Sequence, residues 1–224
     1  MLILTNLDLI RRVPLFAMIT PDQVALLSDA VAKRRFKRGE LVVEQGEKSN
    51  ALFIVLAGRA RVVITDGKGG EVILATLHPG DYIGEMSLID NEPHSASVET
   101  EIQTDVLVLG RAEFTRCLSE NSMMAYSVMR GLVQRLRKAD EKIGSLALMG
   151  VDGRVASVLI GCASADGDIP LLIREKISRQ DIAKMVGASR EMVSRVMRNF
   201  EEQGFIEVLE GGAIVIHERR TVPR

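Results

Sequence analysis

Short apolar runs separated by glycine turns fill the first half of the chain. Four runs rich in Val, Ile and Leu cover residues 52–56, 60–65, 71–77 and 105–109. The turns around them contain Gly39, Gly46, Gly58, Gly69, Gly70 and Gly80. Short strands with close, regular turn spacing are typical of a compact β-roll or barrel. Two helical patterns precede them at residues 7–16 and 21–32, so the roll is predicted from about residue 31 to residue 109.

A long amphipathic helix is predicted over residues 122–148. Its apolar residues recur at three- and four-residue steps, at Met129, Leu132, Val133, Leu136, Ala139, Ile143, Leu146 and Ala147. A stripe of less than three heptads is short for a coiled coil and also fits a helix packed on its own domain. Because this helix lies between two segments of different character, we expect it to pair with a second copy of the chain.

Two short helices joined by a glycine turn are predicted near the C-terminus. Ser178 occupies the N-cap position of the first helix, and Gly187 supplies the turn. Ser189 caps the second helix, whose apolar residues at helical spacing are Val193, Val196, Met197 and Phe200. The polar residues left outside at its beginning are Arg190, Glu191, Ser194 and Arg195. This is the pattern of a helix-turn-helix, and residues 204–217 add a β-hairpin that would form its wing.

Positive charge is concentrated on the predicted helix-turn-helix, although the formal net charge of the chain is −1. Between residues 176 and 200 the basic residues are Lys176, Arg179, Lys184, Arg190, Arg195 and Arg198, and the acidic ones are Asp181 and Glu191. A local positive surface is what contacts to DNA phosphates require, and a solvated helix face is the alternative. Arginine can donate two hydrogen bonds to guanine, and glutamate can accept one from cytosine. Glu191 could also pair with Arg195 one turn along the helix.

The overall composition excludes several classes of protein. With 46% hydrophobic and 26% charged residues the chain can bury a core and is not disordered. No apolar run approaches the ~18 residues that span a bilayer, and no signal-peptide pattern is present, so we expect a soluble cytoplasmic protein with no membrane partner. Cys117 and Cys162 stand far apart, which fits a reducing compartment and leaves no metal-ligand spacing.

Nearly the whole chain resembles the family of the cyclic AMP receptor protein and the fumarate and nitrate reduction regulator. The matching segments are residues 13–16, Gly39, Gly46, Gly58, residues 79–85, residues 178–183 and residues 189–196. The resemblance implies an α+β fold with an N-terminal double-stranded β-roll, a long dimerisation helix and a C-terminal winged helix-turn-helix. The expected domains are the sensor at residues 1–118, the dimerisation helix and hinge at 119–149, and the DNA-binding domain at 150–224.

The resemblance also implies a homodimeric, sequence-specific transcription regulator controlled by a small effector. Arg190, Glu191 and Arg195, with Ser194 beside them, would read base edges in double-stranded DNA. Arg179, Gln180 and Ser189 would hold phosphates. The expected DNA site is an inverted palindrome with half-sites resembling T-G-T-G-A, and RNA polymerase is expected as a further partner.

The effector site departs from the family pattern. In members that bind cyclic AMP, the glutamate of a Gly-Glu pair takes the ribose hydroxyl and the arginine of an Arg-Ser pair takes the cyclic phosphate. This chain keeps Gly84, Glu85 and Ser95, but His94 stands at the arginine position, where a neutral imidazole cannot make a two-pronged contact. On the long helix Arg135 is kept, whereas Ala139 and Asp140 replace two hydroxyl residues that contact adenine. Other members of the family bind cyclic di-GMP, and some need no small ligand, so the resemblance ranks cyclic di-GMP first as the effector, slightly ahead of cyclic AMP in an altered pose, with regulation without a ligand close behind.

Other classes have weaker support. Iron–sulfur members of the family use four cysteines, whereas this chain has two, and His78 is a weak candidate for a haem ligand. A cupin-like enzyme would need clustered histidines, but the roll offers only His78, His94 and Glu85, and no nucleophile elbow or P-loop is present. We therefore expect no enzyme and no metal site. The alternative function is a cyclic-nucleotide-binding module that acts on a protein partner, which would not need the arginines of the second helix.

Overall fold

The computed structural model describes residues 10, 13–16, 20, 27–163 and 171–217. The chain forms two compact units, Met1–Arg137 and Lys138–Arg224, and each is described here by itself. The division falls within one long helix, α5 (Ser122–Leu148), whereas the sequence analysis placed domain boundaries on either side of that helix.

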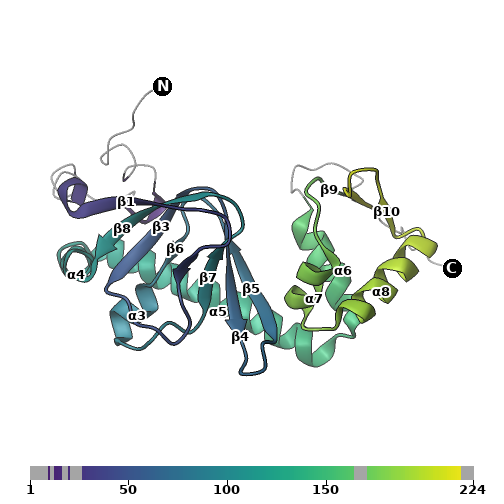
Figure 1. Ribbon diagram of the computed structural model, residues 1–224. Coiled ribbons are helices and arrows are strands. Elements are labelled where there is room, and N and C mark those ends of the chain that lie inside the picture. The colour runs from purple at the N-terminus through teal and green to yellow at the C-terminus, as the bar shows by residue number, and fades with distance from the viewer. Residues whose placement is uncertain (1–9, 11–12, 17–19, 21–26, 164–170, 218–224) are drawn as a thin grey trace. The chain divides into compact units, whose positions relative to one another are not determined.

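Two four-stranded antiparallel sheets build the first unit (Figure 1). One sheet has the order β1 (Val31–Phe36), β8 (Thr104–Gly110), β3 (Ala51–Ala57) and β6 (Tyr82–Ile83). The other has the order β2 (Leu41–Val43), β7 (Ser97–Thr100), β4 (Ala60–Thr65) and β5 (Glu71–Leu77). The four apolar runs of the sequence are strands β3, β4, β5 and β8, so the predicted β-roll is confirmed.

The strands β3 and β8 are apolar at consecutive positions because both of their faces are covered. Leu52 and Ile54 of β3 point to a cluster that includes Phe114 of α4 (Arg111–Glu120) and the first turns of α5. Phe53 and Val55 alternate with them and point to a second cluster between the two sheets. Side chains of a strand alternate between its faces, so a strand with two buried faces shows no polar alternation.

The helix predicted over residues 21–32 is wrong at its end. Residues 27–30 are helical, but Val31 already begins β1, which pairs with β8 from Val31 opposite Leu109 to Phe36 opposite Thr104. Strand pairing over six residues overrides a local helical pattern. Residues 21–26, and residues 7–9, 11 and 12 of the helix predicted at 7–16, lie outside the described residues, and Pro14–Phe16 forms the 3-10 turn η1.

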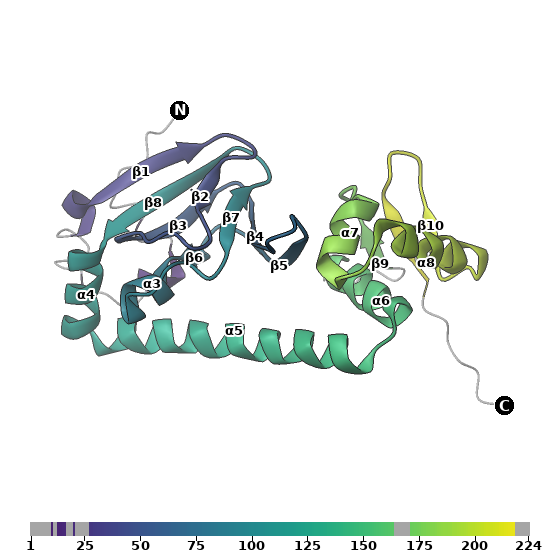
Figure 2. The ribbon, with the colours of Figure 1, turned by 60° about the horizontal axis from the view of Figure 1, so that its bottom comes forward.

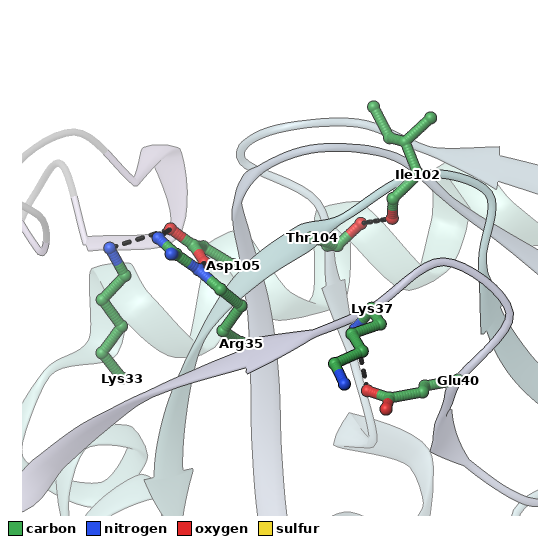
Figure 3. Close-up of polar contacts among 7 residues, drawn as sticks. All are labelled: Lys33, Arg35, Lys37, Glu40, Ile102, Thr104 and Asp105. Atoms are coloured by element: carbon green, nitrogen blue, oxygen red, sulfur yellow. Dashed lines mark hydrogen bonds and ion pairs between the residues drawn. The ribbon is translucent and has the colours of Figure 1, made fainter.

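Ion pairs connect β1, an edge strand, with β8 (Figure 3). The Arg35 Nε and Lys33 Nζ atoms lie 2.6 and 2.9 Å from the carboxylate of Asp105. The hydrogen bond from Arg35, helped by Lys33, lowers the pKa of Asp105 to about 2. Basic side chains along an exposed edge also disfavour pairing with another chain.

The long helix α5 (Figure 2) has the predicted bounds, and it carries an exposed apolar stripe. Only Met124 and Val128 are buried, both in the core of the first unit. The stripe consists of Met129, Val133, Leu136, Ile143 and Leu146, each between 48 and 64% exposed. No helix within the described residues, α5 included, is long and apolar enough to cross a membrane.

Within the described residues, the second unit contains the end of α5, three further helices and a small sheet. The helices are α6 (Val151–Cys162), α7 (Arg179–Val186) and α8 (Arg190–Glu202). The antiparallel strands β10 (Ile206–Val208), β11 (Ile214–Ile216) and β9 (Leu171–Ile173) lie in that order. The predicted winged helix-turn-helix is confirmed, while α4, α6 and β9 were not predicted from the sequence.

Candidate DNA interface and effector site

The beginning of α8 presents a polar surface held by a local cap. Ser189 has an extended backbone, and its hydroxyl accepts a hydrogen bond from the backbone N–H of Met192 at 3.2 Å. The predicted apolar face of the helix is buried, at Val193, Val196, Met197 and Phe200. Arg190, Glu191 and Arg195 are exposed on the other face. The positions predicted to read bases are therefore accessible to a ligand.

Two details of this surface differ from the sequence prediction. Ser194 is half-buried, and its hydroxyl donates to the Arg190 carbonyl at 2.8 Å, so Ser194 is turned back onto the helix instead of outward. Hydrogen bonds from the backbone N–H of Glu191 and the Ser189 hydroxyl lower the pKa of the Glu191 carboxyl. The carboxylate is thus held at the N-terminus of α8 by Ser189, where the helix dipole favours it, and not by Arg195.

The helix α7 carries Arg179 and Gln180, two of the three residues predicted to hold phosphates. Its N-cap Ser178 accepts from the backbone N–H of Asp181 at 3.0 Å, and Gly187 ends it in the left-handed conformation with φ 63°. Gln180 is exposed, but Arg179 is half-buried and its Nη2 lies 3.3 Å from Glu201 Oε1 on α8. Arg179 is therefore tied to the second helix in the absence of DNA.

Met192 is part of this surface although the sequence analysis did not single it out. Its side chain is 43% exposed and lies between Glu191 and Val193 in the first turns of α8. Met192 is not one of the apolar residues at helical spacing on α8, and this could have indicated from the sequence that its side chain is exposed.

In the first unit, Glu85 and Arg135 meet across 50 residues of sequence. Glu85 begins the short helix α3 (Glu85–Asp90), is 1% exposed, and accepts a hydrogen bond from Arg135 Nη1 at 2.5 Å. Arg135 Nη2 also donates to the carbonyl of Tyr82, and the guanidinium lies 5.0 Å from the centre of the Tyr82 ring. Burial raises the pKa of Glu85, and the Arg135 charge opposes this shift. Glu85, which was predicted to accept a hydrogen bond from a ribose hydroxyl, is therefore already paired with the Arg135 guanidinium.

The residue at the predicted phosphate position is also occupied. His94 is 8% exposed, and its Nε2 lies 2.9 Å from the Ser49 hydroxyl, while its backbone N–H donates to the Glu47 carbonyl. Burial lowers the pKa of His94, which favours the neutral imidazole. This histidine therefore supplies no positive charge for a cyclic phosphate.

The other predicted effector residues differ in their surroundings. Gly84 caps α3 with φ 97°, and a Cβ atom there would meet the Ala51 carbonyl oxygen, so only glycine fits. Ser95 is exposed in the loop before β7. Ala139 and Asp140 are exposed on α5 in the second unit.

Sequence reasoning missed Tyr82, Ser49 and Arg111 at this site. The Arg111 guanidinium donates to the carbonyls of Leu88 and Ser87 at 2.9 and 3.1 Å, which fixes the C-terminal end of α3. Tyr82 stood in a matching motif, but nothing in the local pattern revealed its contact with α5. These partners become neighbours only when the roll closes.

Two family models match the chain. The cyclic nucleotide-binding domain matches residues 33–121, and the Crp-like helix-turn-helix domain matches residues 153–221. Within the described residues, no group of three or more His, Cys, Asp or Glu side chains could hold a metal ion.

Similar proteins cover most of the chain. The cAMP-activated global transcriptional regulator Vfr of Pseudomonas aeruginosa is 34% identical over 194 residues, which are 84% of this chain and 90% of that protein. The cAMP-activated global transcriptional regulator CRP of Salmonella typhimurium is 32% identical over 182 residues, 80% of this chain and 86% of that protein. The solved structure of CLP, the c-di-GMP responsive global regulator of Xanthomonas campestris, aligns with a TM-score of 0.77 at 21% identity over 89% of this chain and 100% of that chain. This last similarity concerns the fold.

Proposed function

This chain belongs to the Crp/Fnr family of transcription regulators, and from that premise we infer how its two units serve an effector-controlled, DNA-binding regulator. The observation that carries the DNA-binding function is the exposed polar beginning of α8, capped by Ser189 and backed by a buried apolar face. A helix of this kind, preceded by a second helix and a tight turn, places its N-terminal residues in the major groove.

We propose that Arg190, Glu191 and Arg195 read base edges in half-sites resembling T-G-T-G-A. Arginine side chains suit guanine, and Glu191, as an acceptor among cations, suits cytosine. Arg179, Gln180 and Ser189 would hold the phosphate backbone, with Arg179 exchanging Glu201 for a phosphate when DNA arrives.

We propose that two copies of the chain pair through the apolar stripe of α5. Five large apolar side chains lie about half exposed on one helix, which is more apolar surface than an isolated helix normally leaves in water. A dimer would place its two recognition helices about one helical turn of DNA, ~34 Å, apart. The break at Met149 and Gly150, between α5 and α6, would act as the hinge. RNA polymerase is the further partner that we propose.

The effector that we propose is of the cyclic nucleotide class and reaches Glu85 through a ribose hydroxyl. Vfr and CRP are named as cAMP-activated regulators, but here the phosphate position is a buried, neutral His94 bonded to Ser49. Cyclic AMP would therefore lose its main charge contact, so we expect it to bind weakly or not at all. Cyclic di-GMP is the first candidate, ahead of cyclic AMP in another pose and of a regulator that needs no ligand.

A binding titration tests the DNA-binding function. The purified protein is titrated with a duplex that carries the T-G-T-G-A palindrome and with a duplex of the same composition in scrambled order, both at physiological salt. We expect the palindrome to bind at least about a thousandfold more tightly, as specific sites usually do. Equal affinity for the two duplexes, both without a nucleotide and with each of cyclic AMP, cyclic GMP and cyclic di-GMP, would show that the site or its readers are wrong.

Calorimetry with cyclic AMP, cyclic GMP and cyclic di-GMP tests the effector site, with and without the palindrome present. Micromolar binding of cyclic AMP that is lost in Glu85→Ala would contradict the argument from His94. Binding of a nucleotide that Glu85→Ala leaves unchanged would place the effector elsewhere.

A further inference from the structure

Gly131 lies in the interior of α5, where glycine is the least favourable residue except proline. A Cβ atom built at Gly131 would overlap the hydroxyl oxygen of Tyr82. At Gly144, in the same helix, a Cβ atom would meet nothing within 4 Å. The glycine at position 131 therefore allows a close approach between α5 and Tyr82 that any other residue would prevent.

The Tyr82 hydroxyl is unusual as well. It is buried, and no described residue gives it a hydrogen-bond partner. Burial is also what raises the pKa of the Tyr82 phenol. Buried tyrosine hydroxyls normally have a partner, and one without a partner has lost its hydrogen bonds to water. The contact thus combines two unfavourable features, a glycine within a helix and a buried phenol without a partner, at one point.

The same tyrosine supports the effector site. Its ring and carbonyl both contact Arg135, which lies one turn after Gly131 and pairs with Glu85. Earlier in α5, Met124 and Val128 are buried in the core and anchor the helix there. Beyond Val128, the contacts of the helix with the roll include the partly buried Leu132, the close approach of Gly131 to Tyr82 and the pair of Arg135 with Glu85.

We propose that Tyr82 is a positioning residue that sets an equilibrium between a docked and a released state of α5 beyond Val128. In the docked state Arg135 pairs with Glu85, and these favourable contacts compensate for the buried hydroxyl. An effector that takes Glu85 from Arg135 removes that compensation, and the cost of burying the hydroxyl then favours release. The inference rests on the proposed function, because it gives the effector's place at Glu85 a means of moving the helix.

The proposal predicts opposite effects for two substitutions on either side of the contact. Tyr82→Phe removes the hydroxyl but keeps the ring that contacts Arg135, so it favours the docked state. Gly131→Ala inserts a methyl group at the contact, so it favours the released state. In the double variant the nearest ring atom, Tyr82 Cζ, would stand 3.2 Å from the new Cβ atom, which a small shift relieves, so Tyr82→Phe should rescue Gly131→Ala.

Amide hydrogen exchange of the full-length protein, with no DNA and no nucleotide, measures the docking directly. Residues 129–137 should exchange at least about threefold more slowly in Tyr82→Phe and at least about threefold faster in Gly131→Ala, as expected for loss of one buried unsatisfied group or gain of one overlap. The matched controls are Tyr126→Phe and Gly144→Ala, which alter the same residue types on α5 where the structure shows no such contact. Shifts in the same direction, or shifts no larger than those of the controls, overturn the proposal. If Gly131→Ala does not fold, Tyr82→Phe and the double variant still decide.

The affinity for the T-G-T-G-A duplex without nucleotide then tests whether docking matters for regulation. The two substitutions should move the dissociation constant in opposite directions, and the two controls should not move it. Exchange shifts without any change in DNA affinity would remove the regulatory role of Tyr82. A wild-type protein with no preference for the palindrome, with or without any of the three nucleotides, would instead contradict the proposed function, and the exchange experiment would still decide the role of Tyr82.

Discussion

The beginning of α8 and the segment around Glu85 hold their charged side chains in opposite ways. Arg190 and Arg195 are exposed on α8, and the cap that positions them lies within three residues of sequence. Glu85 is 1% exposed and is paired with Arg135 from a different element. The first surface is accessible to a partner, whereas Glu85 is already paired within the unit, so a ligand that bound at Glu85 would have to displace an existing contact. A DNA reader gains from accessibility, and a sensor gains from a contact that can be exchanged.

The largest effect on DNA binding is expected from a substitution that separates the two copies of α8 in the proposed dimer. Leu136→Glu places a charge in the exposed stripe of α5 and should convert the dimer to monomers. Loss of the second half-site should weaken binding to the palindrome by about a hundredfold or more, because linked sites gain that much from effective concentration. Light scattering and a DNA titration measure both effects. Arg137→Glu, next to the stripe, is the control, and a dimeric Leu136→Glu protein with wild-type affinity would refute this interface.

The exposed arginines of α8 should affect binding but not stability. Arg190→Ala and Arg195→Ala should each weaken the free energy of binding to the palindrome by roughly 1 to 3 kcal/mol. Each should also relax the preference for guanine at the position that the arginine contacts. Thermal unfolding should not change, because neither side chain is buried. Titrations on single-guanine variants of the palindrome measure the preference, with Arg198→Ala, exposed later in α8, as the control. Equal losses on every duplex would show phosphate contacts instead of base contacts.

Arg179 supplies the contrast within the same unit. Arg179→Ala should weaken binding to every sequence alike and reduce the slope of affinity against salt by about one. A sequence-dependent loss in Arg179→Ala would mean that α7, and not only α8, reads bases.

The buried carboxylate of the sensor should behave in the opposite way. Burial raises the pKa of Glu85 in the folded protein, so the charged form is disfavoured there and stability falls as the pH rises through that pKa. Glu85→Gln should therefore raise the free energy of unfolding at pH 7, because the glutamine amide has no charge to desolvate. The gain should vanish below about pH 4, where the carboxyl group is neutral in both folded and unfolded states. Urea unfolding at the two pH values measures this, and a loss of stability at pH 7 would show that the pair with Arg135 outweighs burial.

A smaller effect of opposite sign is expected at Asp105 of the sensor sheet. Its folded pKa of about 2 lies below the ordinary value of 3.8, so the stability it contributes is present above pH 3.8 and is lost as the pH falls toward 2. Asp105→Asn should lower the free energy of unfolding at pH 7 by less than about 1 kcal/mol, because Lys33 and Arg35 are largely exposed and water screens the pair. The same urea experiment at pH 7 and pH 2 checks it. An equal difference at both pH values would mean that the carboxylate charge is not the cause.

The amino-acid sequence by itself determined the elements whose hydrogen bonds and faces are local. Ser178 and Ser189 are caps, Gly187 is the turn, and α5 runs from Ser122 to Leu148 because each depends on neighbours three or four residues away. The same reasoning separated the buried and exposed faces of α8, although it left Ser194 facing outward.

Only the tertiary structure decided which of the predicted effector residues meet and what each already holds. Glu85 and Arg135 are 50 residues apart, His94 and Ser49 are 45 apart, and Tyr82 meets Gly131 on a different element. Val31 likewise begins a strand, and not the end of a helix, because β8 lies beside it. The physical reason is that caps and helical faces form within one segment, whereas these pairs exist only after the roll has closed and brought distant segments into contact.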